Sequence, residues 1–159
     1  IPQIFPVKDV AILENIFNII LFDPGEIINL NSLANNLNIA RQTLSIYLDY
    51  LEKSFLIKKL YNFSKNVRKT ERKLKKYYPT IISPKLIEKR DWGKILETVI
   101  VLQLDADFFW RDVYKNEVDI ILVNGAIVPI EVKSGNKFDT KTISYDSIPK
   151  ASLRQSPAL

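Results

Sequence analysis

Apolar residues recur at helical spacing in three consecutive stretches of the first 54 residues. The first stretch runs from Lys8 to Phe22, and the following Asp23-Pro24-Gly25 ends a helix and begins a turn. A short second helix is expected to begin at Asn31 or Ser32, which are good N-cap residues, and a third to extend from Arg41 to Ser54. A tight connection joins the last two helices, so the pattern predicts a helix-turn-helix.

Two short alternating stretches follow and predict a β-hairpin. The first strand is expected from Leu56 to Tyr61 and the return strand from Lys75 to Tyr78. The residues between them contain the densest run of Lys and Arg in the chain, so the hairpin would be a basic wing. Residues 1–82 are therefore predicted to form a winged helix-turn-helix.

The second half of the chain has the pattern of one helix followed by three strands. After a start near Pro84, a helix is predicted from Gly93 to Leu104, and strands are predicted at Phe108–Arg111, Glu117–Val123 and Ala126–Lys133. The Asn-Gly turn between the last two strands is a strong hairpin signal. Residues 136–159 are irregular in pattern, so residues 83–159 are predicted to form an α-β-β-β unit without an obvious final helix. The predicted fold class is thus α+β or α/β.

Composition narrows the chemistry that this fold could support. The 159 residues include no Cys and no His, which excludes disulfides, thiolate or imidazole zinc sites, and Ser-His-Asp or Cys-His catalysis. Catalysis would have to use carboxylates, Lys, Arg, Tyr, hydroxyl groups or hard cations. No apolar stretch approaches the roughly 20 residues that span a bilayer, and no signal segment precedes the first helix. We therefore expect a cytoplasmic protein without a membrane partner, cut from an internal or C-terminal part of a longer polypeptide.

The positive charge is concentrated in one part of the sequence. Residues 51–90 contain 13 Lys and Arg against three acidic residues, whereas the segments before and after them are net negative. Such a block is typical of surfaces that bind polyphosphate. A solvated loop, or a surface that faces an acidic partner domain, has the same composition.

A winged helix that binds DNA inserts the start of its third helix into the major groove, while cations of the wing neutralise phosphates. The residues expected to do so are Arg41, Gln42, Thr43 and Ser45 in the helix and Lys65, Arg68, Lys69, Arg72, Lys73, Lys75 and Lys76 in the wing. Winged helices also serve as protein–protein or interdomain modules. The basic wing favours DNA, and an interdomain role stays open.

Carboxylates occur in the second half on elements that are otherwise apolar. Glu97 lies on a mostly apolar helix, and a lone buried acid requires a partner. Asp119 is expected to face the same side of its strand as Ile121, because side chains two residues apart lie on one face. Glu131 and Lys133 are expected to share a face for the same reason.

Oxygen ligands of this kind suit Mg²⁺ or Mn²⁺, with Asp119 and Glu131 as the expected ligands. Lys133 would then position or deprotonate the attacking water in metal-assisted phosphodiester hydrolysis. On spacing alone, an ordinary ion pair between Glu131 and Lys133 is the competing interpretation.

The order of these residues resembles a known superfamily. Glu97, then Asp119 before aliphatic residues, then Glu131-Val132-Lys133 is similar to the PD-(D/E)XK, or restriction-endonuclease-like, nucleases, whose core is an α-β-β-β-α arrangement. More narrowly, the chain resembles the C-terminal domain of unknown function that follows the P-loop domain in archaeal and bacterial AAA-type ATPases. The segments that carry this resemblance span most of residues 30–135: Ser32-Leu33-Ala34, Tyr47 to Ile57, Phe63 to Lys69, Phe109-Trp110-Arg111, Glu117-Val118-Asp119 and Ile130 to Gly135.

The resemblance implies a DNA-binding winged helix, a nuclease-like core and an N-terminal ATPase domain in the same polypeptide. Its implied catalytic residues are Glu97, Asp119, Glu131 and Lys133. The family usually has an Asp-Thr-Gly-Leu-like stretch after the wing, whereas Tyr78-Pro79-Thr80-Ile81-Ile82 lacks that Asp and Gly. No P-loop motif occurs in this sequence, so ATP binding is expected only in the ATPase domain. The working hypothesis is an Mg-dependent deoxyribonuclease module, and the alternative is a non-catalytic DNA-binding or interdomain regulatory module.

Overall fold

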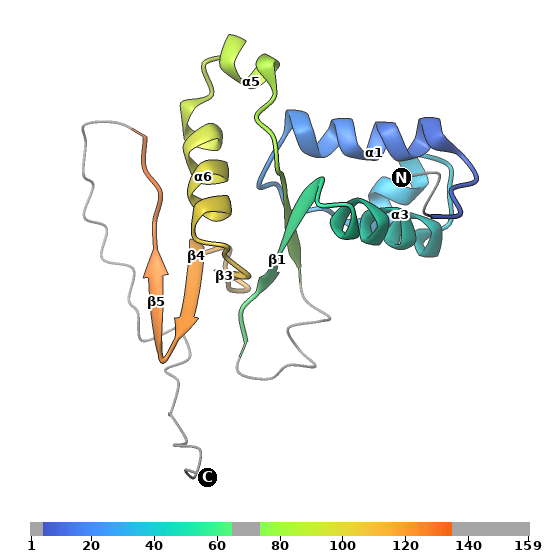
Figure 1. Cartoon of the computed structure of the whole chain (residues 1–159). Coiled ribbons are helices and arrows are strands. Elements are labelled where there is room, and N and C mark those ends of the chain that lie inside the picture. Colours follow the sequence, from blue (N-terminus) through green and yellow to red (C-terminus); the bar gives the residue numbers. More distant parts are fainter. Residues whose placement is uncertain (1–4, 65–73, 135–159) are drawn as a thin grey trace, which may run out of the picture.

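The computed structural model describes residues 5–64 and 74–134, which form an α+β structure with five helices and one five-stranded mixed sheet. The elements are, in order, α1 (Val10–Phe22), α2 (Leu30–Asn36), α3 (Arg41–Lys53), β1 (Ile57–Asn62), β2 (Lys75–Pro79), α5 (Pro84–Glu88), α6 (Trp92–Gln103), β3 (Phe108–Arg111), β4 (Glu117–Asn124) and β5 (Ala126–Ile130). Figure 1 shows α1 and α3 grouped on one side of β1, and α6 beside β4 and β5 on the other side. The α+β class that the sequence predicts is confirmed.

Side-chain caps and a shared apolar core hold the first three helices. The Asp9 carboxylate caps α1 by accepting a hydrogen bond from the N–H of Ile12, and the Asn29 side chain caps α2. The cap predicted at Asn31 or Ser32 is therefore placed too late. The core side chains are Leu13, Ile16, Ile20, Ala34, Leu44, Tyr47, Leu48, Leu51, Ile57 and Tyr77. Among the described helices, none has the length and apolar character needed to cross a membrane.

Both hairpins that the sequence predicts are present. β1 pairs antiparallel with β2, from Ile57 opposite Pro79 to Tyr61 opposite Lys75. β4 pairs antiparallel with β5 around Gly125, whose φ of 71° suits a tight turn. The segment 65–73, which contains five of the predicted wing contacts, lies outside the described residues.

A single sheet joins the two predicted domains. The strand order is β2-β1-β3-β4-β5, and β1 pairs with β3 in parallel while the other neighbours are antiparallel. The boundary predicted after residue 82 falls between β2 and α5. Both predicted domains therefore contribute strands to the same sheet. One apolar cluster lies on the α6 face of this sheet, with Val101 of α6 packed against Leu60 and Phe109, and a second one contains Trp110, Val118 and Ile121.

The structure differs from the prediction at α5 and at the end of β5. Helix α5 is absent from the prediction, although Ser83 caps it and Pro84 occupies its first turn, which is a recognisable start signal. β5 ends at Ile130 rather than Lys133. Glu131 and Lys133 therefore follow the strand, and the expectation that both lie on one face of it is wrong.

Candidate functional site

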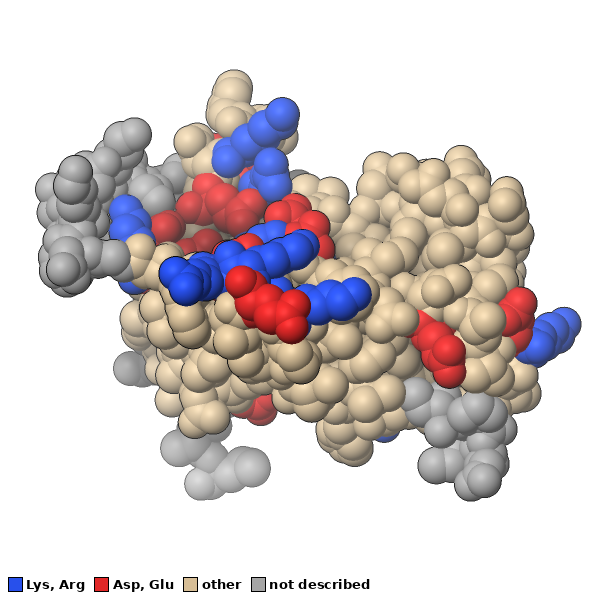
Figure 2. Space-filling view, turned by 90° about the horizontal axis from the view of Figure 1, so that it is seen from above, with Lys and Arg blue, Asp and Glu red and all other residues tan. Residues whose placement is uncertain are grey.

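A pocket of about 270 Å³ lies between the turn after α1, β2, α6 and β4. Its lining residues are Pro24, Gly25, Glu26, Ile27, Lys76, Lys94, Glu97, Arg111, Glu117 and Asp119. Figure 2 shows acidic side chains in a hollow on the side of the molecule where α6 lies, bordered by Lys and Arg side chains, whereas the side of the three N-terminal helices presents few charges in this view. Two of the four predicted catalytic residues, Glu97 and Asp119, thus meet in one pocket.

Lys76 lies between acidic side chains of this pocket. Its Nζ is 2.5 Å from Glu117 Oε1 and 3.4 Å from Glu97 Oε1, and the residue is only 4% exposed. Burial lowers the pKa of Lys76, but the charges of Glu97 and Glu117 outweigh that effect and leave the pKa above its ordinary value. The ammonium therefore stays charged and supplies a buried positive charge to the pocket.

This position corrects the prediction that Lys76 contacts DNA from the wing. Side chains alternate along a strand, so Lys76 and Tyr78 lie on the pocket side of β2 while Tyr77 packs into the helical core. The alternation was visible in the run Lys75-Lys76-Tyr77-Tyr78, in which the second lysine falls on the same side as Tyr78. Sequence reasoning also missed Glu117 and Arg111, whose guanidinium Nη1 is 3.1 Å from Glu117 Oε2.

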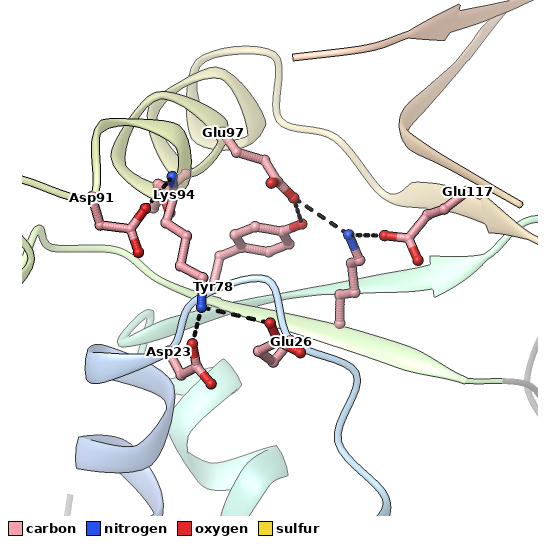
Figure 3. A network of polar contacts seen from close by, with 9 residues as sticks. Asp23, Glu26, Tyr78, Asp91, Lys94, Glu97 and Glu117 are labelled. Atoms are coloured by element: carbon pink, nitrogen blue, oxygen red, sulfur yellow. Dashed lines mark hydrogen bonds and ion pairs between the residues drawn. The ribbon is translucent and has the colours of Figure 1, made fainter. Parts of the chain in front are cut away.

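Glu97 has the partners that a half-buried carboxylate on an apolar helix requires. Its Oε1 accepts a 2.6 Å hydrogen bond from the hydroxyl of Tyr78, which points toward it in Figure 3. Burial and the Glu97 charge raise the pKa of Tyr78 far above its usual range, so the phenol remains a donor. Gly25 permits this contact, because a Cβ there would lie 2.9 Å from Tyr78 Cε1 and 3.2 Å from Glu97 Oε1. Its φ of 78° also favours glycine.

Lys94 fixes the opposite wall of the pocket. Its ammonium pairs with Asp23 and lies 3.5 Å from Glu26 Oε1, as Figure 3 shows, so the first turn of α6 is tied to the turn that follows α1. The backbone N–H of Lys94 donates to Asp91 Oδ1, which caps the same helix. These contacts hold Glu97, one turn further along α6, at a fixed position over β2.

A β-bulge turns Asp119 toward the pocket. Phe108 pairs with Ile121 and Trp110 with Val118, so Asp119 and Ile120 of β4 stand opposite Phe109 alone. Ile121 packs in the cluster of Trp110 and Val118, whereas Asp119 lines the pocket. The prediction that Asp119 shares a face with Ile121 is therefore wrong, because the extra residue breaks the alternation on which it rested.

Asp119 is also linked to the chain after β5. Its Oδ2 accepts a 2.8 Å hydrogen bond from the N–H of Val132, and burial raises the pKa of the Asp119 carboxyl. The pKa of the exposed Glu131 is raised by partial burial and by the charge of Asp119, and it is lowered by Lys133. The charges of Asp119 and Lys133 thus both act on Glu131 at this end of β5.

The oxygen donors of Asp119 and Glu131 fit a hard divalent cation by their chemistry. Within residues 5–64 and 74–134, no group of three or more acidic side chains is placed to hold a metal ion. The magnesium or manganese site stays a prediction that rests on this pair.

The predicted DNA contacts of α3 lie near the start of that helix. Arg41, Gln42 and Ser45 are exposed there, and Thr43 is half-buried. Ser45 also lines a hollow between α3 and the hairpin, together with Lys75. Lys75 Nζ lies 5.6 Å from the centre of the Tyr61 ring. The remaining wing contacts, Lys65, Arg68, Lys69, Arg72 and Lys73, lie outside the described residues.

Residues 1–80, just over half of the chain, match the family described as Domain of unknown function (DUF8612). The chain belongs to the DUF8612 family. No curated protein and no solved structure gives a significant match. The DUF8612 region contains helices α1 to α3 and the β1–β2 hairpin, and thus Lys76 of the pocket and Tyr78, which donates to Glu97. Glu97, Glu117 and Asp119 follow it, so the pocket is built from both sides of the family boundary.

Proposed function

We propose that this chain is a DNA-binding module with a nuclease-like site that hydrolyses phosphodiester bonds with a divalent metal. The observation that carries the proposal is the convergence of Glu97 from α6 and Asp119 from the β4 bulge in one pocket, with Glu131 in electrostatic contact with Asp119. Bulges that re-aim one side chain are frequent next to active sites. The element order α6-β3-β4-β5 supports a restriction-endonuclease-like core.

DNA binding is supported by the first five elements. Three helices followed by an antiparallel hairpin is the order of a winged helix, and the exposed start of α3 is the part of such a fold that reads the major groove. The hairpin ends border residues 65–73, which contain Lys65, Arg68, Lys69, Arg72 and Lys73 against a single acid. This charge would supply salt-dependent binding to phosphates.

In the proposed hydrolysis, in which a water attacks the phosphorus and the P–O bond to the leaving oxygen breaks, Asp119 and Glu131 would hold the cation, and Lys133 would position the water and steady the scissile phosphate. A bound Mg²⁺ or Mn²⁺ supplies Lewis acidity at the phosphate. Glu97 stays hydrogen-bonded to Tyr78, and the pair shapes the pocket from the α6 side.

Plasmid nicking in Mg²⁺ or Mn²⁺ tests the proposal. Asp119→Asn removes the charge of the bulge residue with little change in size, and we expect its rate to fall at least about a hundredfold. The matched control is Glu14→Gln, the same chemical change at an exposed position of α1, which should leave the rate unchanged. Equal nicking by Asp119→Asn and the unsubstituted chain would mean that a contaminating nuclease acts, and it would refute the proposal.

A non-catalytic DNA-binding or regulatory module is the second candidate, and one observation favours it. The Lys76 ammonium already lies between Glu97 and Glu117, beside Asp119, and neutralises part of the charge that would attract a metal. In that case the chain binds DNA without nicking it, and Asp119→Asn binds as the unsubstituted chain does. The resemblance to ATPase C-terminal domains supports a P-loop ATPase domain of the same polypeptide as the partner of either module.

A further inference from the structure

The turn between β3 and β4 presents two large apolar side chains to solvent. Val113 is 88% exposed and Tyr114 is 84% exposed, more than any other large apolar side chain that the structure describes. Neither side chain belongs to an apolar cluster of the fold. Exposed apolar groups that stand together are typical of binding surfaces.

The backbone of this turn is held in place by Asp112. Its carboxylate accepts hydrogen bonds from the N–H groups of Tyr114 and Asn116, at 2.8 and 2.9 Å, and from the Asn116 side chain at 2.8 Å. The N–H of Asp112 in turn donates to the carbonyl of Asn116. The two apolar side chains are therefore displayed on an ordered turn, which lowers the entropy lost when a ligand binds.

The turn lies at the end of the sheet where β1 ends. β1 and β3 are parallel neighbours, so the last residues of both strands lie at this same end. The Asn62 side chain exchanges two hydrogen bonds with the backbone of Arg111, at 2.9 and 3.1 Å, and the Asn62 N–H donates to the carbonyl of Leu74. Asn62 thus joins Arg111, three residues before Tyr114, to Leu74, where the described chain resumes after residue 73.

The acidic residues near the turn, Asp112 and Glu117, have donors of their own and so repel a polyanion only weakly. The Asp112 carboxylate faces three N–H donors, and Glu117 pairs with Lys76 and Arg111. Lys115 adds a positive charge within the turn itself. Arg111 and Lys115 thus offset Asp112 and Glu117, so residues 111–117 add no net negative charge beside the apolar pair.

We infer that Tyr114, with Val113 beside it, is a stacking site for an unpaired nucleobase of the DNA that the basic segment attracts. An aromatic ring offers any base a flat apolar partner, and an adjacent aliphatic side chain can act as a wedge at a base step. Stacked bases inside a duplex present no free face to such a ring, so the site selects single-stranded tails or forks. This inference rests on the proposed DNA binding and adds the DNA structure that the module prefers.

Fluorescence anisotropy of the 159-residue chain tests the inference, with a blunt duplex and the same duplex carrying an unpaired thymidine tail. We expect tighter binding of the tailed DNA. Tyr114→Ala should weaken that binding by roughly five- to a hundredfold, the range of base–aromatic stacking, and should leave the blunt duplex unaffected. Tyr114→Phe keeps the ring and should bind as the unsubstituted chain does.

Phe55→Ala is the matched control. Phe55 is 83% exposed and lies just before the start of β1, whereas Tyr114 lies near the end of that strand. The Phe55→Ala variant should leave both affinities unchanged. If Tyr114→Ala binds the tailed DNA as tightly as the unsubstituted chain does, the stacking site is overturned but the proposed DNA binding is not. If Tyr114→Ala loses the same affinity for both DNAs, the stacking site is likewise overturned, while the proposed DNA binding of the chain stands. Absence of binding to either DNA by the unsubstituted chain overturns the stacking site and the proposed DNA binding together.

Discussion

Replacement of Lys76 by Met would remove the ammonium between Glu97 and Glu117 and keep an unbranched apolar side chain. Removal of one partner of a fully buried ion pair costs about 3–5 kcal/mol. Here the carboxylate side chains of Glu97 and Glu117 keep 21% and 26% of their exposure, and each keeps a second donor, Tyr78 and Arg111 respectively. We therefore expect the free energy of unfolding to fall by about 1–3 kcal/mol.

Urea unfolding at several pH values measures this loss and its cause. Burial raises the pKa of Asp119, so the folded state holds that proton more tightly, and this group adds stability as the pH falls through its folded pKa. Lys76 lowers the pKa of Asp119, and its removal should strengthen this trend. The deficit of Lys76→Met should thus be largest at neutral pH and shrink as the pH falls through the folded-state pKa of Asp119.

Lys75→Met serves as the matched control, since it makes the same change at the neighbouring residue, which lines the hollow beside α3. It should leave the pH dependence of stability unchanged. Mn²⁺ at a hundred times its dissociation constant for Lys76→Met should stabilise that variant by about 2.7 kcal/mol over its metal-free form, and the same Mn²⁺ concentration should stabilise the unsubstituted chain less. A Lys76→Met variant as stable as the unsubstituted chain at neutral pH, with no dependence on pH or Mn²⁺, would refute the view that this ammonium compensates the acids of the pocket.

Two further substitutions test the contacts around Glu97. Gly25→Ala adds a Cβ that would lie 2.9 Å from Tyr78 Cε1, and it should destabilise the fold more than Gly125→Ala, which has a similar positive φ but no atom within 4 Å. Thermal unfolding should place Gly125→Ala about 1–2 kcal/mol below the unsubstituted chain, and a Gly25→Ala loss of the same size would contradict the close contact. Tyr78→Phe removes the hydroxyl that donates to Glu97 and should cost about 1–2 kcal/mol at pH 7, whereas an unchanged midpoint in urea would show that water replaces the hydroxyl fully.

Local sequence patterns predict most helices and strands of this chain because each has a clear apolar period and defined turn residues. The start of α1 is displaced by two residues because Asp9 is its N-cap, and the end of β5 by three because the Val132 N–H donates to the Asp119 carboxylate. Glu97 illustrates what a local argument achieves, because an acid on an apolar helix face requires a partner, and it has two.

The orientation of Asp119 and the burial of Lys76 could not be predicted in the same way. The bulge at Asp119 depends on how β4 pairs with β3. The pattern of apolar and polar residues in β4 does not indicate this pairing. Lys76 is buried because it pairs with Glu97 and Glu117, which lie on elements later in the chain. A basic run with the pattern of a solvent-facing segment therefore contributes one lysine to the interior. Pairing between distant segments decided both positions.

The parallel pairing of β1 with β3 has a consequence for how such chains diversify. The matched DUF8612 region ends at residue 80, and one edge of its hairpin is completed by a strand that arrives about 50 residues after β1 begins. Grafted elsewhere, this region would expose the backbone edge of β1 and the side chains of Leu60 and Tyr78 unless its new host offered an equivalent strand. A transferable unit would therefore include β3 together with the hairpin, or its new host would have to supply a strand in the place of β3.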